Sequence, residues 1–148
     1  MNAISLLFAV GASFLALVQP SQQPASLRQT YERHIAAIAA RDLPTLMATV
    51  TDKPQLHFID SRGTLRRTRA DFHKYHVEWF AQKGWKISFA RQSLHQRGDH
   101  GYVMSIYTYE DITSEGQPYK AEGFVTLVFE RRDGQWRMVA DICTTIRK

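Results

Sequence analysis

One hairpin, between Phe124 and Cys143, constrains the fold of this chain most strongly. Two long apolar runs meet there at Asp133-Gly134. Asp-Gly between such runs is a strong hairpin signal, because both central residues of the tight turn need positive φ. We therefore predict two antiparallel strands joined by a two-residue turn.

The two-residue turn also predicts the register of the two strands. The apolar face then pairs Phe129 with Met138, Leu127 with Ala140, and Val125 with Ile142. The other face pairs Glu130 with Arg137, Val128 with Val139, Thr126 with Asp141, and Phe124 with Cys143. In this register Asp141 points toward a dimer partner or solvent, and only a bulge or strong sheet curvature would turn it inward.

The first 25 residues differ from the rest of the chain in composition. They carry no Asp, Glu, Lys or Arg, and an apolar run, ISLLFAVGASFLALV, is followed by a stretch rich in Gln, Pro and Ser. This pattern predicts a secretory signal peptide over residues 1–25, and hence a periplasmic or secreted protein. An uncleaved anchor is the alternative, but the run is shorter than the roughly 20 residues of a spanning helix, so no stable membrane span is expected.

Charge and cysteine content limit the possible partners of the remaining chain. The net charge of +5 belongs to residues 26–148, and part of it comes from four arginines at positions 62, 66, 67 and 69. Such a cluster can bind nucleic acid or anionic lipid, but no aromatic platform accompanies it, so a solvated loop and no nucleic-acid partner are expected. Cys143 is the only cysteine, so we predict a small buried strand residue and no disulfide within the chain.

Periodicity and turn residues predict the other elements of residues 26–148. Three helices are expected over residues 26–41, 43–50 and 69–83, with Ser26 as an N-cap and Gly84 as the C′ residue of the last. Strands are expected over residues 56–59, 85–95, 102–111, 119–131 and 136–146. Short connections between the last four strands indicate an antiparallel meander. The prediction is an α+β domain with its helices packed on one sheet face.

Three motifs in this order resemble a known family. They are Arg41-Asp42-Leu43, the HVEWF stretch that begins at His76, and the run from Phe129 to Val139 that leads into Asp141 and Thr144. From Ser26 onward the chain resembles the nuclear transport factor 2-like (NTF2-like) superfamily, and within it the SnoaL-like and DUF4440-type domains. The resemblance implies a cone of three N-terminal helices on a curved antiparallel sheet, with a pocket between them and dimerisation through the sheet.

The resemblance leaves the function open, because this superfamily includes ketosteroid isomerases, epoxide hydrolases, cyclases, dehydratases and binding modules. Relatives often have Asp-Gln-Asn-Thr near the end of the last strand, whereas this chain has Asp141-Ile142-Cys143-Thr144. The two middle polar residues are therefore replaced. A polar site built on them is not expected to be conserved in this chain.

Asp60, His76 and Asp141 are the candidate catalytic residues. A carboxylate in an apolar pocket has its pKa raised by desolvation and can act as a general base near neutral pH. Asp60 follows the first strand, near the position at which isomerases of similar fold have their catalytic base. The same position also fits an ordinary turn residue. His76 lies in the apolar stripe of the third helix. It can be an acid or base of the pocket, or a histidine at the edge of the core.

Ligand contacts are expected from aromatic and imidazole side chains of the pocket. The candidates are Tyr31, His57, Trp79 and Tyr107, although such aromatics can equally fill the core. His57 is included because the position of the family's base aligns with it as well as with Asp60. His73 and His76 share a helix face, but no third ligand can be placed beside them, so neither a metal nor a cofactor is expected.

Two functions follow from these residues. The first is an exported homodimeric module that binds a small apolar molecule in its cone. The alternative is a small acid/base enzyme of isomerase, hydrolase or dehydratase type that uses a pocket Asp or His.

Overall fold

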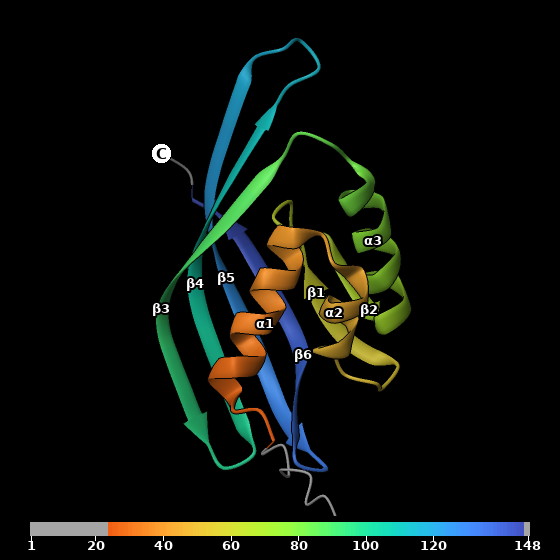
Figure 1. Ribbon diagram of the computed structural model, residues 1–148, viewed down its shortest axis with the longest axis vertical. Coiled ribbons are helices and arrows are strands. Elements are labelled where there is room, and N and C mark those ends of the chain that lie inside the picture. Colours follow the sequence, from red (N-terminus) through yellow and green to blue (C-terminus); the bar gives the residue numbers. More distant parts are fainter. Residues whose placement is uncertain (1–23, 147–148) are drawn as a thin grey trace, which may run out of the picture.

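The computed structural model describes residues 24–146, and this part of the chain folds into three helices and one six-stranded sheet (Figure 1). The helices are α1 (Leu27–Ala40), α2 (Leu43–Ala48) and α3 (Arg69–Ala81). The strands are β1 (Gln55–Ile59), β2 (Leu65–Thr68), β3 (Lys86–Arg97), β4 (His100–Ile112), β5 (Pro118–Arg132) and β6 (Gln135–Thr145). Almost all of the expected signal segment, 1–25, lies outside the described residues, so it stays a prediction.

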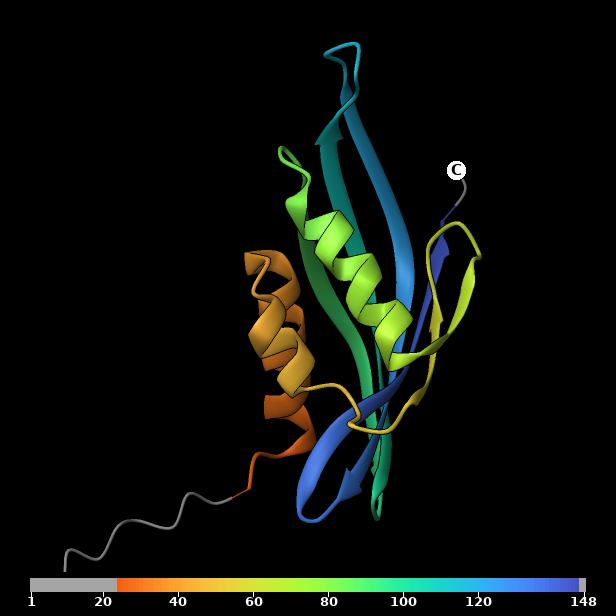
Figure 2. The same ribbon diagram turned by 90° about the vertical axis from the view of Figure 1, so that its right-hand side faces the viewer.

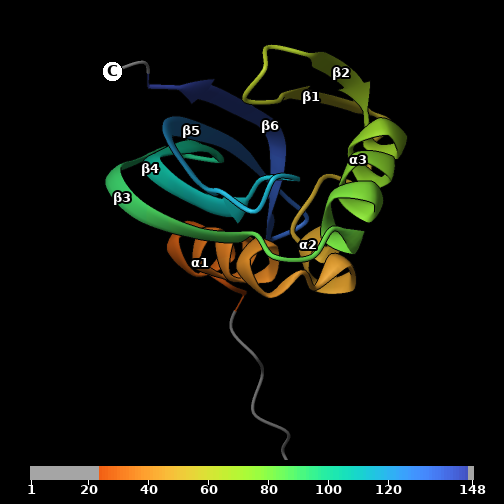
Figure 3. The same ribbon diagram turned by 90° about the horizontal axis from the view of Figure 1, so that it is seen from above.

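The sheet has the strand order β2-β1-β6-β5-β4-β3. Strands β3 to β6 form the expected antiparallel meander, but β1 pairs with β6 in parallel. The expectation of a wholly antiparallel sheet is therefore wrong. The long connection from β1 to β6, through α3 and four strands, allows parallel pairing that a hairpin would forbid. Seen from above, the sheet curves toward the side that carries the helices (Figure 3).

Strand β2 was expected to be a loop. Residues 65–68 instead pair antiparallel with β1 and form one edge of the sheet. The strand reads LRRT, is short and is mostly exposed. Charged side chains are common on edge strands because they discourage pairing with other chains, and here they removed the alternation that predicts a strand.

The helix ends follow local capping chemistry. Ser26 and Gln29 form a capping box at the start of α1, as the N-cap prediction requires. Helix α3 ends at Ala81, with Gln82 as an extended cap, so Gly84 is not its C′ residue. Gly84 has a φ of 100° and makes the turn into β3 instead.

The helices pack on one face of the sheet, although β1 and β2 separate α3 from the first two helices in sequence (Figure 2). The core lies between the helices and this sheet face. Its largest fully buried side chains include Tyr31, Phe72, Phe129, Leu27, Leu46 and Met138. Burial of such apolar surface is the main stabilising contribution to a domain of this size.

The hairpin between β5 and β6 confirms the predicted turn. Asp133 and Gly134 both have positive φ, 49° and 75°. The predicted pairing holds from Arg132 opposite Gln135 as far as Phe129 opposite Met138. Beyond that point the register differs from the prediction.

A β-bulge at Val139 shifts the register by one residue. Val128 lies opposite Ala140, so Val139 has no partner on β5. Asp141 then lies opposite Leu127 rather than Thr126. The predicted outward orientation of Asp141 is wrong, because one extra residue in a strand turns every later side chain to the other face.

The bulge lies where β6 changes partners on its other edge. The backbone N–H of Met138 donates to Thr49 O at 2.8 Å, and the N–H of Thr51 donates to Met138 O at 2.9 Å. From Ala140 onward β6 pairs with β1 instead. Val139 is the residue between these two sets of partners.

The close packing of β5 against β4 and β6 can be tested at Gly123. A Cβ atom at this position would collide with the Thr144 carbonyl oxygen and the Tyr107 phenol. We expect Gly123→Ala to lower the free energy of unfolding by roughly 1–3 kcal/mol, measured by urea denaturation. The control Thr126→Ala, on the same strand but the other face, should change it by less than about 0.5 kcal/mol; equal losses would contradict this packing.

Candidate functional site

A cavity of about 470 Å³ lies between the inner face of the sheet and the helices α1 and α3. Its apolar wall includes Ile35, Ile38, Phe58, Phe89, Val125 and Leu127. This volume falls within the range typical of small-molecule sites. The candidates Asp60, His76 and Asp141 all lie in the lining.

Asp141 is a buried carboxyl group with little polar support. It is 4% exposed, and the Sγ of Cys143, at 3.5 Å from Oδ1, is its one hydrogen-bond donor among the described residues. Burial raises the pKa of Asp141 from 3.8 to about 7, and the hydrogen bond from Cys143 opposes this only weakly. Both protonation states are therefore populated near neutral pH.

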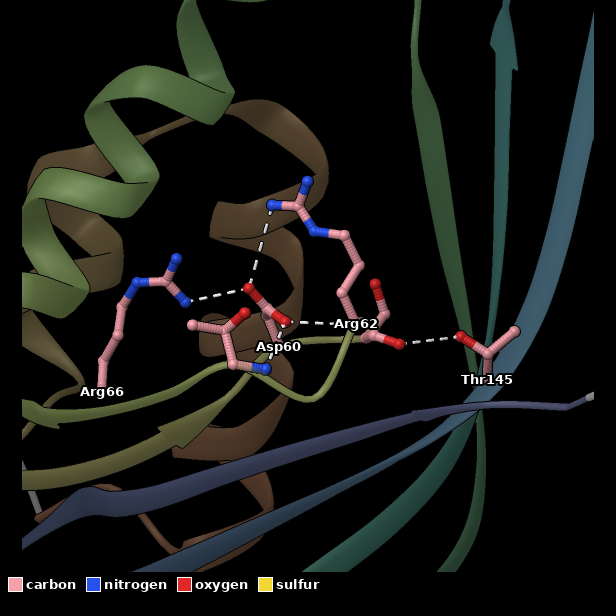
Figure 4. Close-up of polar contacts among 6 residues, drawn as sticks. Asp60, Arg62, Arg66 and Thr145 are labelled. Atoms are coloured by element: carbon pink, nitrogen blue, oxygen red, sulfur yellow. Dashed lines mark hydrogen bonds and ion pairs between the residues drawn. The ribbon is translucent and has the colours of Figure 1, made fainter.

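Asp60 is equally buried but accepts three hydrogen bonds (Figure 4). Its Oδ1 accepts the backbone N–H groups of Arg62 and Thr64, each at 3.0 Å, and its Oδ2 accepts Arg66 Nη1 at 2.9 Å. Burial alone would raise the pKa of Asp60, but the hydrogen bonds from Arg66 and from the two backbone groups outweigh it and lower the pKa. Asp60 is thus an ionised anchor of the β1–β2 turn.

The β1–β2 turn is also tied to the end of β6. The Thr145 hydroxyl donates to the Ser61 carbonyl oxygen at 3.0 Å (Figure 4). Ser61, Arg62 and Thr145 all belong to the cavity lining. The turn therefore forms part of the cavity wall in a defined position.

His76 is buried, neutral and accessible as a hydrogen-bond acceptor. Its Nδ1 lies 2.8 Å from the Phe72 carbonyl oxygen, which can only accept, so Nδ1 carries the proton. Nε2 then has a free lone pair, and none of the described residues hydrogen-bonds it. Burial lowers the pKa of His76 to about 4, although the Phe72 hydrogen bond opposes this, so the imidazole is uncharged at neutral pH.

The four expected ligand contacts separate into two pairs. Trp79 and Tyr107 line the cavity, whereas Tyr31 and His57 do not. Tyr31 is buried between α1 and β4, where its hydroxyl lies 2.6 Å from Ser105 Oγ. His57 is exposed, because successive β1 residues alternate in direction and Phe58 takes the inner face.

Tyr75 and Cys143 are among the lining residues that the sequence analysis did not name as site residues. Cys143 was expected to be only a small buried strand residue, yet it lines the cavity. Tyr75 precedes His76 in the HVEWF region, which could have indicated it. Burial, followed by the neighbouring Asp141 carboxyl, raises the pKa of Cys143, so its thiol is not a nucleophile at neutral pH.

Residues 24–146 contain no group of three or more His, Cys, Asp or Glu side chains that could hold a metal. Within this described part of the chain, no helix is long and apolar enough to cross a membrane.

The family of this chain follows from a match over most of its length. The model of the SnoaL-like domain family matches residues 27–141. The chain belongs to this family, as its motifs indicated. No curated protein matches the sequence.

Solved structures with the same fold have different descriptions. A ketosteroid isomerase-like protein from Erwinia carotovora atroseptica superposes with a TM-score of 0.71 at 13% identity, over 86% of this chain and 98% of that one. An NTF2-like protein of unknown function from Shewanella oneidensis gives 0.66 at 18% identity, over 80% and 95%. The CaMKII hub of S. rosetta gives 0.66 at 18% identity, over 83% and 99%. At these identities the likeness shows the NTF2-like fold alone.

The raised pKa of Asp141 predicts a pH-dependent cost of folding. Its folded pKa, about 7, exceeds the ordinary value of 3.8. The contribution of Asp141 to the free energy of unfolding is therefore most favourable below pH 3.8, and it is lost as the pH rises through 7. At pH 8 the folded wild type must bury a charge. We expect Asp141→Asn to raise the free energy of unfolding at pH 8 by up to about 4 kcal/mol, with a much smaller change at pH 5, measured by urea denaturation.

Asp60→Asn is the matched control, because the folded pKa of Asp60 is lowered. Its contribution to stability is present above its unfolded pKa and is lost as the pH falls. The variant should therefore be less stable than wild type at pH 8. Destabilisation by Asp141→Asn at pH 8 would contradict a buried, poorly solvated carboxylate.

Proposed function

We propose that the cavity binds a small apolar molecule and that Asp141 exchanges a proton with it. The observation that carries the proposal is a nearly unsupported carboxyl group, with its pKa raised to about 7, in the wall of an apolar cavity. A general acid or base works best when its pKa lies near the working pH. Asp141 meets this condition at neutral pH.

The other two candidates take supporting roles in this proposal. Asp60 has a lowered pKa, because it accepts hydrogen bonds from Arg66 and from two backbone N–H groups, and is therefore a weak base near neutral pH. His76 offers Nε2 as an acceptor for a ligand donor, but its pKa of about 4 makes it a weak base. Asp60 therefore fixes the cavity wall, and His76 is a neutral acceptor for a ligand that carries a hydrogen-bond donor.

The reaction class that fits these groups is proton abstraction from carbon next to a carbonyl group. Apolar side chains of Phe, Val and Leu in the cavity wall reduce the solvation of the Asp141 carboxylate, which strengthens it as a base. One similar structure is described as ketosteroid isomerase-like, in keeping with a fold that can hold such a site. This class needs no metal and no redox partner.

Deuterium exchange at the α-carbon of 2-tetralone in D₂O tests the proposed chemistry. We expect the wild-type protein to accelerate exchange beyond buffer, with a rate that rises with pH and levels off above about pH 7, as Asp141 loses its proton. Asp141→Asn should lower this rate by about 10²-fold or more. NMR measures the exchange directly.

Binding measured in parallel separates an enzyme from a binding module. Asp141→Asn should keep its affinity for 2-tetralone within a few-fold, because Asn preserves the shape of the side chain. Tight binding without exchange by the wild type would support the alternative of a ligand carrier. Absence of binding would contradict the proposed function as a whole.

We also propose that the chain forms a homodimer through the outer face of its sheet. Tyr102, Phe124 and Ile142 are 43%, 41% and 36% exposed. They lie on β4, β5 and β6. On this face Phe124 pairs with Ile106, Tyr102 pairs with Val128, and Ile142 pairs with Thr126, which lies between Phe124 and Val128 on β5. Exposed apolar side chains on neighbouring strands often mark interaction sites.

Phe124→Glu tests the dimer. The buried charge should shift the protein from dimer to monomer in sedimentation equilibrium. Leu65→Glu is the control, because Leu65 is similarly exposed at 40% but lies on the edge strand β2. A monomeric wild type, or an equal effect of both variants, would contradict this interface.

A further inference from the structure

The tyrosines of the cavity differ in what their hydroxyl groups contact. The Tyr107 hydroxyl donates to the Thr144 carbonyl oxygen at 3.2 Å, and the Tyr109 hydroxyl donates to Asp111 Oδ2 at 2.7 Å. Tyr119 is 49% exposed on the β4–β5 hairpin, where water can reach it. No residue of the described chain hydrogen-bonds the hydroxyl of Tyr75, which also lines the cavity.

The ring of Tyr75 is held firmly by its neighbours. It packs edge-to-face on Phe58, with centroids 4.9 Å apart, and on His76 at 5.2 Å. The guanidinium carbon of Arg66 lies 4.6 Å from its ring centroid, and the same guanidinium is bound to Asp60 at 2.9 Å. Cation–π and edge-to-face contacts of this type orient a phenol.

Tyr75 stays protonated over the whole neutral range. Burial raises the pKa of its phenol to about 12, and the charge of Asp60 adds to this effect. A protonated phenol is a hydrogen-bond donor, and the hydroxyl of Tyr75 has no hydrogen-bond partner among the described residues. A ligand oxygen in the cavity can accept this hydrogen bond.

Tyr75 and Asp141 flank the same residue of the cavity wall. Phe58 packs against the Tyr75 ring, and it pairs with Asp141 across the parallel strands β1 and β6. Cys143, which hydrogen-bonds Asp141, lines the same cavity as Tyr75. The donor and the proton-exchanging carboxyl group therefore face one region of the cavity.

We propose that the Tyr75 hydroxyl donates the hydrogen bond that orients the ligand, and that the ligand class is an uncharged, apolar molecule with one acceptor oxygen, such as a ketone. This inference rests on the proposed function, because it assumes that the same cavity binds the ligand. It assigns Tyr75 a specificity role. A hydrocarbon of equal shape lacks the acceptor and binds less tightly.

A matched pair of probes tests the assignment: 2-tetralone, and tetralin, which has the same fused rings without the oxygen. Their affinities are measured by NMR titration for the wild type, for Tyr75→Phe and for the control Tyr109→Phe. The wild type should prefer the ketone, and Tyr75→Phe should weaken ketone binding by roughly 3- to 10-fold while leaving tetralin unchanged. Phe keeps the packing of the ring, so the fold is expected to survive, and Tyr109→Phe should retain the preference because Asp111 already holds that hydroxyl.

The carbonyl stretch of bound 2-tetralone gives a second readout that a merely structural role would not move. Its frequency should be lowered in the wild type by the hydrogen bond and should rise in Tyr75→Phe. Equal binding of both probes with no effect of Tyr75→Phe would overturn the role of Tyr75 and leave the proposed cavity function standing. Failure of both probes to bind would overturn the proposed function and this inference with it. Loss of deuterium exchange in Asp141→Asn tests only the proton exchange by Asp141 and does not bear on Tyr75.

Discussion

The bulge at Val139 decides which side chains of β6 face the cavity. Without it, the regular register from the Asp133-Gly134 turn would place Asp141 outside the sheet. With it, Asp141 lies opposite Leu127 on the inner face and is 4% exposed. The hydrogen bonds of Met138 to Thr49 and Thr51 explain the site of the shift, since β6 changes from that segment to β1 within two residues. The candidate site therefore depends on an irregularity of the backbone.

The two buried aspartates illustrate how surroundings determine the chemistry of a carboxyl group. Asp60 receives two backbone N–H groups and the guanidinium of Arg66, and its pKa falls. Asp141 receives only the weak donor Cys143, and its pKa rises to about 7. Both are nearly inaccessible to solvent, so burial alone does not distinguish them. The number and strength of their hydrogen-bond donors distinguish the two carboxyl groups.

The same comparison connects the fold to the proposed ligand. The SnoaL-like fold supplies an apolar cavity, while similar structures carry descriptions as different as a ketosteroid isomerase-like protein and a CaMKII hub. Function in such a fold depends on the few polar groups left unpaired inside the cavity. Among the described residues these groups include the hydroxyl of Tyr75, the Nε2 of His76 and the carboxyl group of Asp141, whose one donor is the thiol of Cys143. Together they describe a site for an apolar molecule with an acceptor oxygen.

The sequence by itself determined the local elements, because their signals depend on nearby residues: the Ser26 cap, the apolar stripe of α3, the Asp-Gly turn and the meander. Only the tertiary structure decided the parallel pairing of β1 with β6, the edge strand β2 and the inward direction of Asp141, because each depends on partners far apart in the chain. The positions of Tyr31 and Tyr75 were also decided by the tertiary structure. The hydroxyl of Tyr31 lies outside the cavity beside Ser105, and that of Tyr75 has no partner among the described residues. Neither fact can be inferred from the spacing of residues in the sequence.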